Sequence, residues 1–418
     1  MIQSWDYQNE YKFLSRKIFS SIKRVFKSGN LFFGNELNKF EKEFLKQNKS
    51  KYGVAVANGT DALYLSLKAL NIGKGDEVIT VANTAIPTVS AIVNAGANVK
   101  FVDVGKDYLI DIDQIEESIT KNTKAIIAVH LYGQSCNMQK ILALGKKYKI
   151  KIIEDCAQAQ GAKYRNQNVG NFGITGCFSF YPTKILGAYG DGGFVTTNNK
   201  KLFQKIRRLR FYGMEQIDQS KWWNKKYFAV ENGMNSRLSE IQASILNIKI
   251  KYLNSFIKKR RQIADMYQKH ITNPKVIKPP VEKSNFHVYH LYVVRSENRE
   301  RILKKMKQLK INLSIQYPYP LHKMQAYKNS KYKNLQNTEK FAKTIFSLPT
   351  YPDIEKWKIK KIISISKGVT AGNNFLKNYA SSINSKTIML PTAINTKTYF
   401  SKKKKKNSIF TIGWVGSP

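Results

Sequence analysis

The chain has 418 residues, of which 42% are hydrophobic, and its 71 Lys and Arg against 28 Asp and Glu give a formal net charge of +43. This length accommodates about two or three domains with buried cores, and no run of about 18 apolar residues indicates a membrane-spanning helix. Such a charge can indicate nucleic-acid binding, but only 12 of the basic residues are Arg and the lysines are spread along the chain, so we expect solvated lysine faces, no nucleic-acid binding and no membrane insertion.

The first 13 residues lack the basic and then apolar regions of a secretory signal. The three cysteines, Cys136, Cys156 and Cys177, lack the spacing of a disulfide framework or a zinc site. Both observations favour a reducing cytoplasm.

The first 50 residues predict two helices. Phe19, Ile22, Val25 and Phe26 follow a helical period that ends near residues 28–30, and a second apolar period covers 35–47.

Short apolar strands then alternate with helices. The expected strands are 52–57, 78–81, 99–102, 125–129 and 150–153, and helices are expected near 63–70, 88–94, 112–118 and 138–148. This alternation predicts an α/β fold with a mostly parallel central sheet and helices on both faces. Functional groups are then expected at the carboxyl ends of the strands.

Further along, helices are expected at 201–212, 239–267 and 299–309, with strands at 288–294 and 313–317. We divide the chain into an N-terminal segment with a large domain (1–245), a smaller α+β domain (246–366) and a tail (367–418).

One stretch carries a chemical signature. Asp155 follows the apolar run 149–153 with only Glu154 between them, and Lys184 precedes the glycine-rich segment 187–193. A lysine amine attacks an aldehyde only when it is unprotonated, which requires a sheltered site. An acid that faces the ring nitrogen of pyridoxal 5′-phosphate (PLP) keeps that nitrogen protonated. A surface lysine and a helix-capping Asp are the alternative interpretation.

Upstream, Asn58-Gly59-Thr60 opens an expected helix, where backbone N–H groups and the helix dipole can hold a phosphate. Gly-Thr is also an ordinary helix start. With Asp155 and Lys184 following in that order, the phosphate site is the better interpretation.

From about residue 4 to 366 the sequence resembles the DegT/DnrJ/StrS family of PLP-dependent sugar aminotransferases. The resemblance rests on several ordered motifs: SGNLFFGNELNKFEKEF, ANGTDALYLSLKAL, EDCAQAQGA, CFSFYPTKILGAYGDGGF, GMNSRLSEIQASIL and YPYPLHKMQAY. It implies the fold-type-I architecture of PLP-dependent aminotransferases.

The resemblance also implies roles for single residues. Lys184 corresponds to the lysine that carries the cofactor and moves the proton, Asp155 to the partner of the pyridine nitrogen, and Gln158 to the hydrogen-bond donor for the phenolic oxygen. The positions of the phosphate cup are Gly59, Thr60 and Ser179.

Asn235 matches an asparagine that reaches the phosphate of a neighbouring subunit, which implies a homodimer with shared active sites. Tyr317 is a candidate for contact with the sugar, with core packing as the alternative.

The chain departs from the family pattern at several positions. Where an aromatic residue often stacks on the cofactor, it has Ala85-Ile86-Pro87, so that either Ile86 covers the ring or this face is more open. The other departures are Ile174, Ile185 and Gln316.

The remaining candidates have ordinary structural interpretations. We expect His130 to be a satisfied buried histidine and the cysteines to be inert neighbours of the site. No histidine set has metal-ligand spacing, so no metal is expected, and Trp222-Trp223 is expected to pack in a loop.

The expected activity is transfer of an amino group, with glutamate as donor, to C3 of a dTDP-3-oxo-6-deoxyhexose for surface polysaccharide, lipopolysaccharide or O-antigen synthesis. Amination at C4 or C2 is the alternative within the family. Alternatives of other classes are a non-catalytic PLP-binding regulatory protein and, from the net charge, a nucleic-acid-binding protein.

The tail, 367–418, resembles pieces of a two-domain GT-B glycosyltransferase, at 371–376, 390–395 and 412–417. A single strand has no sheet to pair with, so we expect a poorly ordered fragment without glycosyltransferase activity.

Overall fold

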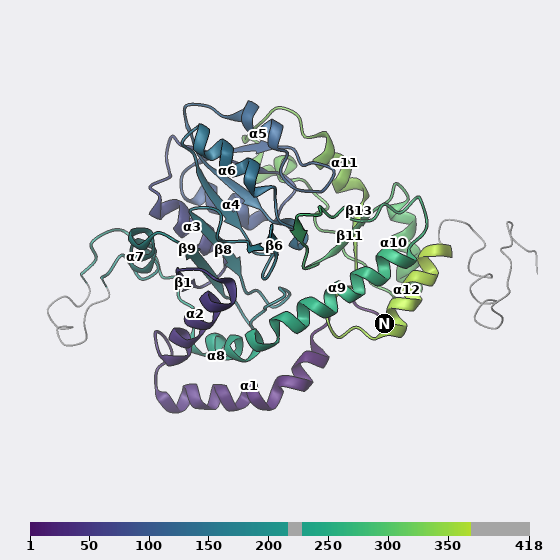
Figure 1. Cartoon of the computed structure of the whole chain (residues 1–418), viewed down its shortest axis with the longest axis horizontal. Coiled ribbons are helices and arrows are strands. Elements are labelled where there is room, and N and C mark those ends of the chain that lie inside the picture. The colour runs from purple at the N-terminus through teal and green to yellow at the C-terminus, as the bar shows by residue number, and fades with distance from the viewer. Residues whose placement is uncertain (216–227, 369–418) are drawn as a thin grey trace, which may run out of the picture.

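The computed structural model describes residues 1–215 and 228–368, so the Trp222-Trp223 pair and almost all of the tail lie outside the described residues. The central feature is a sheet of eight strands in the order β1-β9-β8-β5-β4-β2-β3-β12 (Figure 1). Its strands are β1 (Tyr52–Val56), β2 (Glu77–Val81), β3 (Asn98–Val102), β4 (Thr123–Val129), β5 (Lys151–Asp155), β8 (Thr175–Ser179), β9 (Gly193–Thr197) and β12 (Lys331–Tyr332).

Seven of these strands run in one direction, and β9 is antiparallel to both of its neighbours, β1 and β8. The prediction of a mostly parallel sheet with surrounding helices is therefore confirmed. The parallel strands bring their carboxyl ends to one edge, which is where the candidate site lies.

Helices surround the sheet. They are α1 (Gln8–Ser28), α2 (Asn35–Asn48), α3 (Gly59–Ala69), α4 (Ile86–Asn94), α5 (Ile112–Ser118), α6 (Met138–Lys147), α7 (Lys200–Leu209), α8 (Glu240–Lys249), α9 (Leu253–His270), α10 (Arg299–Gln308), α11 (Gln336–Thr344) and α12 (Lys356–Gly368).

Successive side chains of a strand point to opposite faces of the sheet, and both faces are buried under helices. In β8, Cys177 joins the apolar cluster that also contains residues of α3 to α7. Its neighbour Phe178 joins a second cluster, formed with α2, α8 and the start of α9. Strands that are buried on both faces give the continuous apolar runs seen in the sequence.

The first helix differs from its expected apolar face. Leu14, Ile18 and Val25 are buried, and Leu14 and Ile18 pack with α8, but Phe19 and Phe26 are 59% and 60% exposed. Figure 1 shows α1 along the outside of the molecule, next to α8.

The expected long helix 239–267 is two helices, α8 and α9, joined by the short 3-10 turn η3 (Ile250–Tyr252). In Figure 1 the pair runs diagonally from the central sheet to α10 and α12. There a two-stranded sheet pairs β11 (Tyr292–Arg295) with β13 (Ile345–Leu348).

Two strand predictions in this region need correction. The expected strand 288–294 is a strand only from Tyr292, and the expected strand 313–317 forms a single bridge, Ser314 with Ser347. The segment after Ser314 leaves the sheet and runs toward the candidate site.

Three minor strands, β6 (Lys163–Tyr164), β7 (Gln167–Asn168) and β10 (Asn285–Phe286), form a separate small sheet. Within residues 1–215 and 228–368, no helix is long and apolar enough to span a bilayer.

Candidate active site

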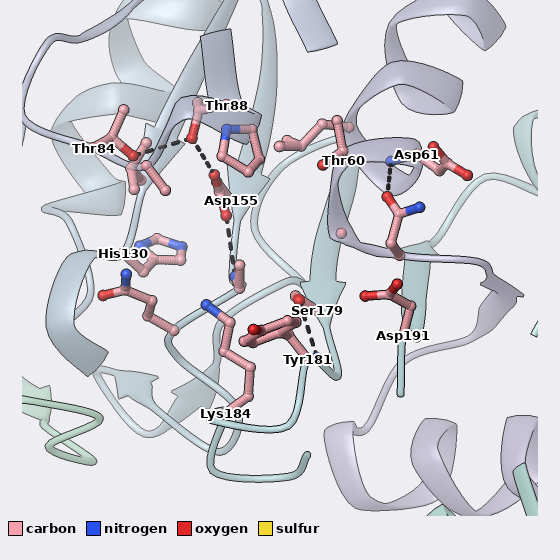
Figure 2. Close-up of a pocket in the computed structure, with 18 residues that line it drawn as sticks. Thr60, Asp61, Thr84, Thr88, His130, Asp155, Ser179, Tyr181, Lys184 and Asp191 are labelled. Atoms are coloured by element: carbon pink, nitrogen blue, oxygen red, sulfur yellow. Dashed lines mark hydrogen bonds between the residues drawn. The ribbon is translucent and has the colours of Figure 1, made fainter. Parts of the chain in front are cut away.

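A cavity of about 530 Å³ opens at the carboxyl ends of the parallel strands (Figure 2). Each of the strands β1, β2, β4, β5 and β8 contributes lining residues at or just after its last residue. The predicted residues that line the cavity are Gly59, Thr60, Asp155, Gln158, Ser179 and Lys184. Six positions between residues 59 and 184 therefore converge on one space, as the sequence predicts.

Lys184 lies on the loop that follows β8, and its side chain points toward Asp155 (Figure 2). Its backbone N–H donates to the carbonyl of Tyr181 at 2.8 Å. A Cβ on Gly187 would lie 2.4 Å from the carbonyl oxygen of Pro182, so only glycine lets the loop fold back here. Burial lowers the pKa of Lys184 to about 8, against the opposing charge of Asp155.

Asp155 is the buried last residue of β5. Its Oδ2 accepts the hydroxyl hydrogen of Thr88 at 2.8 Å, and its Oδ1 accepts the N–H of Ala157 at 3.1 Å. Burial raises the pKa of Asp155, while these two hydrogen bonds and the amine of Lys184 lower it. The carboxylate is thus held in one orientation at the cavity wall.

Gln158 is oriented by its neighbours. Its Oε1 accepts the N–H of Tyr132 at 2.8 Å, which assigns the other amide atom as Nε2. That nitrogen donates to the hydroxyl of Tyr317 at 2.8 Å and keeps a second N–H. Tyr317 does not line the cavity and reaches it only through Gln158.

The start of α3 forms a backbone cup. The side chain of Asn58 accepts the N–H of Asp61 at 2.8 Å, and no other described residue takes the N–H groups of Gly59 and Thr60. A Cβ on Gly59 would lie 2.7 Å from the Cβ of Ser179, so glycine is required for this close approach. A free helix N-terminus beside a serine hydroxyl suits a phosphate.

Sequence reasoning did not single out three polar residues at this cavity: Thr88, Asp61 and Asp191. Asp61 accepts the hydroxyl hydrogen of Ser236 at 2.6 Å, and burial raises the pKa of Asp61. Asp61 and Asp191 could have been found from the sequence, because each lies within or next to a segment that was predicted to form the site.

The departures from the family pattern leave the cavity intact. Ala85 lines the cavity, whereas Ile86 is 49% exposed and is not among the lining residues, which favours the more open face. Ile185 is buried in the apolar cluster with α2 and α8. The side chain of Gln316 accepts a hydrogen bond from Ser347, on β13, at 2.8 Å.

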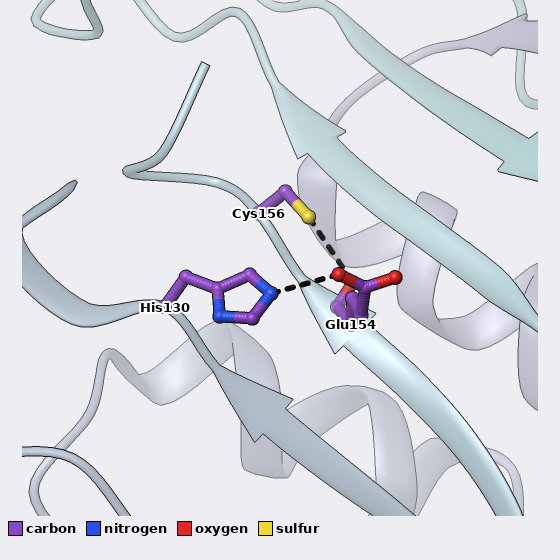
Figure 3. Close-up of side chains that lie close together, drawn as sticks. All are labelled: His130, Glu154 and Cys156. Carbon is purple, nitrogen blue, oxygen red and sulfur yellow. Dashed lines mark hydrogen bonds and ion pairs between the residues drawn. The ribbon is translucent and has the colours of Figure 1, made fainter. Parts of the chain in front are cut away.

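His130, Glu154 and Cys156 are buried next to the cavity, with possible ligand atoms within 4.8 Å of one another (Figure 3). His130 Nδ1 accepts the N–H of Cys136 at 3.1 Å, so Nε2 carries the proton and donates to Glu154 at 3.0 Å. His130 is therefore a satisfied histidine, in agreement with the sequence analysis.

Glu154 also accepts three backbone N–H groups, at 2.7 to 2.8 Å, from Gly170, Phe172 and Gly173. Its two oxygens are fully used within the protein. This cluster fastens the loop before β8 and is not arranged to hold a metal.

Asn235 lies outside the cavity of its own chain. It is exposed and forms a backbone bridge with Phe211. The next residue, Ser236, donates a hydrogen bond to Asp61, which lines the cavity.

The sequence model of the DegT/DnrJ/EryC1/StrS aminotransferase family matches residues 13–366. The chain belongs to this family. It is 39% identical over 376 residues to the dTDP-3-amino-3,4,6-trideoxy-alpha-D-glucose transaminase of Micromonospora megalomicea subsp. nigra, covering 88% of this chain and 98% of the relative. It is 42% identical to the dTDP-3-amino-3,6-dideoxy-alpha-D-galactopyranose transaminase of Aneurinibacillus thermoaerophilus, covering 83% and 94%.

Among solved structures, the chain is similar to S. venezuelae DesV in complex with a ketimine intermediate. The TM-score is 0.83 with 34% sequence identity, over 88% of this chain and 98% of that chain. The fold of this DegT/DnrJ/EryC1/StrS aminotransferase is thus that of its family.

PLP, the expected cofactor, fits the donor set of the cavity. The aldehyde of PLP requires an amine, which Lys184 supplies, and its ring nitrogen requires an acid, which is the buried carboxylate of Asp155 fixed by Thr88. The phenolic oxygen can accept the free amide N–H of Gln158, and the phosphate fits the backbone cup at the start of α3.

Proposed function

We propose that the protein transfers an amino group from glutamate to C3 of a dTDP-3-oxo-6-deoxyhexose, with PLP as cofactor. One observation carries the proposal: Lys184 and Asp155 face one cavity that also has a free helix N-terminus. The substrate class is supported by two relatives that are named as dTDP-3-amino-sugar transaminases.

Bound PLP supplies an electron sink for the negative charge that develops when the reacting carbon loses its proton. Asp155 holds a proton at the ring nitrogen, and Thr88 and Ala157 prevent the carboxylate from turning away. Gln158 donates its free N–H to the phenolic oxygen. The cup at Gly59 binds the phosphate, so the ring cannot rotate in the cavity.

Lys184 attaches the cofactor and moves the proton between the reacting carbon atoms. Its pKa of about 8 suits both tasks, because near neutral pH the amine can accept a proton and give it back. Burial supplies most of this effect, and the charge of Asp155 limits it.

Amination at C4 or C2 remains the alternative within the family, since the cofactor-binding residues do not distinguish the carbon. The non-catalytic PLP-binding alternative predicts a missing lysine or acid, and both Lys184 and Asp155 are present in this chain.

The first experiment tests the cofactor site. Protein that has been incubated with PLP is treated with borohydride and digested, and mass spectrometry locates the attached group. We expect it on Lys184, with none in Lys184→Ala and no change in the exposed-lysine control Lys201→Ala. Turnover of glutamate and keto-sugar by Lys184→Ala would refute the proposal.

The second experiment tests the substrate. A panel of dTDP- and UDP-linked 2-keto, 3-keto and 4-keto sugars is offered with glutamate, glutamine or aspartate, and the product is examined by NMR. We expect the highest kcat/KM with the dTDP-3-oxo-6-deoxyhexose and glutamate. A product with nitrogen at C4 or C2 would establish the alternative.

We also propose a homodimer in which Asn235 completes the partner's phosphate site. Support comes from the exposure of Asn235 and from the exposed apolar side chains of Leu31, Phe32, Phe228 and Val230. Mixing Lys184→Ala with Asn235→Asp after partial unfolding should restore activity, because one site of each hybrid is intact. Failure to restore it would contradict shared sites.

The remaining proposals concern context. Three free buried cysteines support a reducing cytoplasm, and an amino-sugar product supports surface-glycan synthesis. We keep the division into 1–245, 246–366 and 367–418 as a proposal, with no glycosyltransferase activity in the last part. Sugar transfer to an acceptor by the purified chain would refute that.

A further inference from the structure

A second cavity, of about 640 Å³, lies between α2, β1 and α7. It shares no lining residue with the cavity that contains Lys184. We call it the edge groove, because β1 is the last strand of the central sheet and no strand within residues 1–215 and 228–368 lies on its other side.

The edge groove is positively charged. Lys39 and Lys42 on α2, Lys51 before β1 and Arg207 on α7 line it, and none has an ion-pair partner within residues 1–215 and 228–368. Partial burial and the charge of Arg210 lower the pKa of Arg207, and the carboxylate of Glu41 offsets part of this effect.

Two acids also line the groove, and one of them is already used. Glu41 accepts a hydrogen bond from Arg210 at 2.7 Å, so that pair is neutral together. Glu43 can then offset only one of the four positive charges that line the groove. The excess charge favours an anionic ligand.

The groove also has a flat apolar wall. The rings of Tyr52 and Phe203 stack with centroids 5.4 Å apart and planes 23° apart. Both rings are half-buried, and the guanidinium carbon of Arg207 lies 5.8 Å from the centroid of the Phe203 ring. An aromatic pair beside cations suits a ligand with a planar ring and a phosphate.

The open edge of β1 supplies hydrogen bonds at one position. Alternate residues of an antiparallel strand bond to the partner strand, and the others face away from it. Ala55 faces away, since Glu41 accepts its N–H at 2.9 Å and Arg210 donates to its carbonyl at 2.7 Å. Gly53 has the same orientation and lines the groove, and no described residue pairs with its N–H or C=O.

This single open residue decides between two kinds of ligand. An added peptide strand needs several free residues in a row, and Ala55 is already capped. One N–H beside one C=O matches a nucleobase edge, which carries a neighbouring acceptor and donor. A cavity of this volume holds a molecule of nucleotide size.

We propose that the edge groove is a second binding site, for a nucleoside diphosphate. Gly53 and the Tyr52–Phe203 pair hold the base, and Lys39, Lys42, Lys51 and Arg207 hold the phosphates. The site is separate from the transamination cavity and does not depend on the proposed reaction.

Calorimetric titration of the full-length, PLP-loaded protein with dTDP tests the proposal. The variant Lys42→Ala/Arg207→Ala should weaken one class of site about tenfold or more, because each cation makes a charge-assisted contact. The control Lys46→Ala/Lys201→Ala removes the same charge from the same helices outside the groove and should leave the titration unchanged. The variant should transaminate at the wild-type rate.

The stoichiometry separates this proposal from the proposed function. If the proposed function and the groove site are both correct, the wild type has two dTDP sites per chain and the variant weakens one of them. If only the edge groove binds dTDP, the wild type has one site per chain and the variant weakens that site. A photoreactive probe, 5-azido-UDP, should label the peptide with Tyr52 or the peptide with Phe203. Absence of the groove site, labelling elsewhere, equal weakening by the control pair, or equal affinity for pyrophosphate alone would overturn the proposal.

Discussion

Replacement of Glu154 by Gln tests the interpretation of the buried cluster beside the cavity. The native side chain accepts four hydrogen bonds, two on each oxygen. A glutamine keeps one oxygen and places an NH₂ group against two donors, the N–H of Gly170 and the Nε2–H of His130. His130 cannot compensate by moving its proton from Nε2 to Nδ1, because the Nδ1–H would then meet the N–H of Cys136 and neither could accept.

The expected loss follows from these contacts. Two hydrogen bonds to a charged group are removed, at about 1.5–3 kcal/mol each, so Glu154→Gln should lower the free energy of unfolding by about 3–6 kcal/mol. That is a large part of the typical total of about 5–15 kcal/mol.

The assay is urea unfolding of the two proteins without cofactor, combined with hydrogen exchange of residues 170–173. The matched control is Glu116→Gln, whose side chain is exposed and pairs with Lys147, and it should unfold as the wild type does. An unchanged urea midpoint and unchanged exchange at residues 170–173 in Glu154→Gln would refute the reasoning. Stabilisation of the wild type by Zn²⁺ would instead indicate a metal site.

Three further predictions concern the cavity. Burial lowers the pKa of Lys184 to about 8, so the amine is protonated below that pH, and the rate of PLP capture, followed by absorbance, should rise between pH 7 and 9. Asp155→Asn should move the midpoint of this rise to lower pH, because the charge of Asp155 raises the pKa of Lys184. A midpoint above pH 10 would contradict a sheltered amine. Gly59→Ala places a Cβ 2.7 Å from that of Ser179, so PLP should bind about tenfold more weakly or worse in an equilibrium titration, and an unchanged Kd would mean that the cup tolerates the methyl group. Thr88→Val removes the hydroxyl hydrogen bond to the buried Asp155, which should lower the free energy of unfolding by about 1.5–3 kcal/mol and lower kcat/KM of the folded enzyme about tenfold. An unchanged kcat/KM would assign Thr88 a structural role only.

The central fold could be read from the sequence because its strands are buried on both faces. Runs such as Ala125–Val129 have no polar alternation, and helices separate them, which indicates parallel strands. The segment 313–317 shows the limit of such patterns: its alternation of apolar and polar residues predicts a strand, but Tyr317 contacts Gln158 instead of a neighbouring strand. Short-range patterns do not contain that contact across 159 residues.

The site shows a similar division. Asp155, Lys184 and Gly59 could be predicted, because their chemistry and order are specific. Thr88 could not, since a threonine early in a helix is ordinary and its role comes from a contact with Asp155, 67 residues away. The exposure of Phe19 on α1 was also hidden, because a helical period does not reveal which apolar residues meet another element.

The position of β9 has a consequence for how the chain folds. In the sheet β1 pairs only with β9, whose residues follow about 140 positions later. At about 5–20 residues per second, the ribosome needs about 7–30 s to make the intervening chain. During that time an apolar strand has no sheet neighbour, and long-range pairing of this kind slows folding. The lysine loop lies between β8 and β9, so β1 finds its neighbouring strand only after Lys184 has been made, and until then its apolar residues are exposed to aggregation.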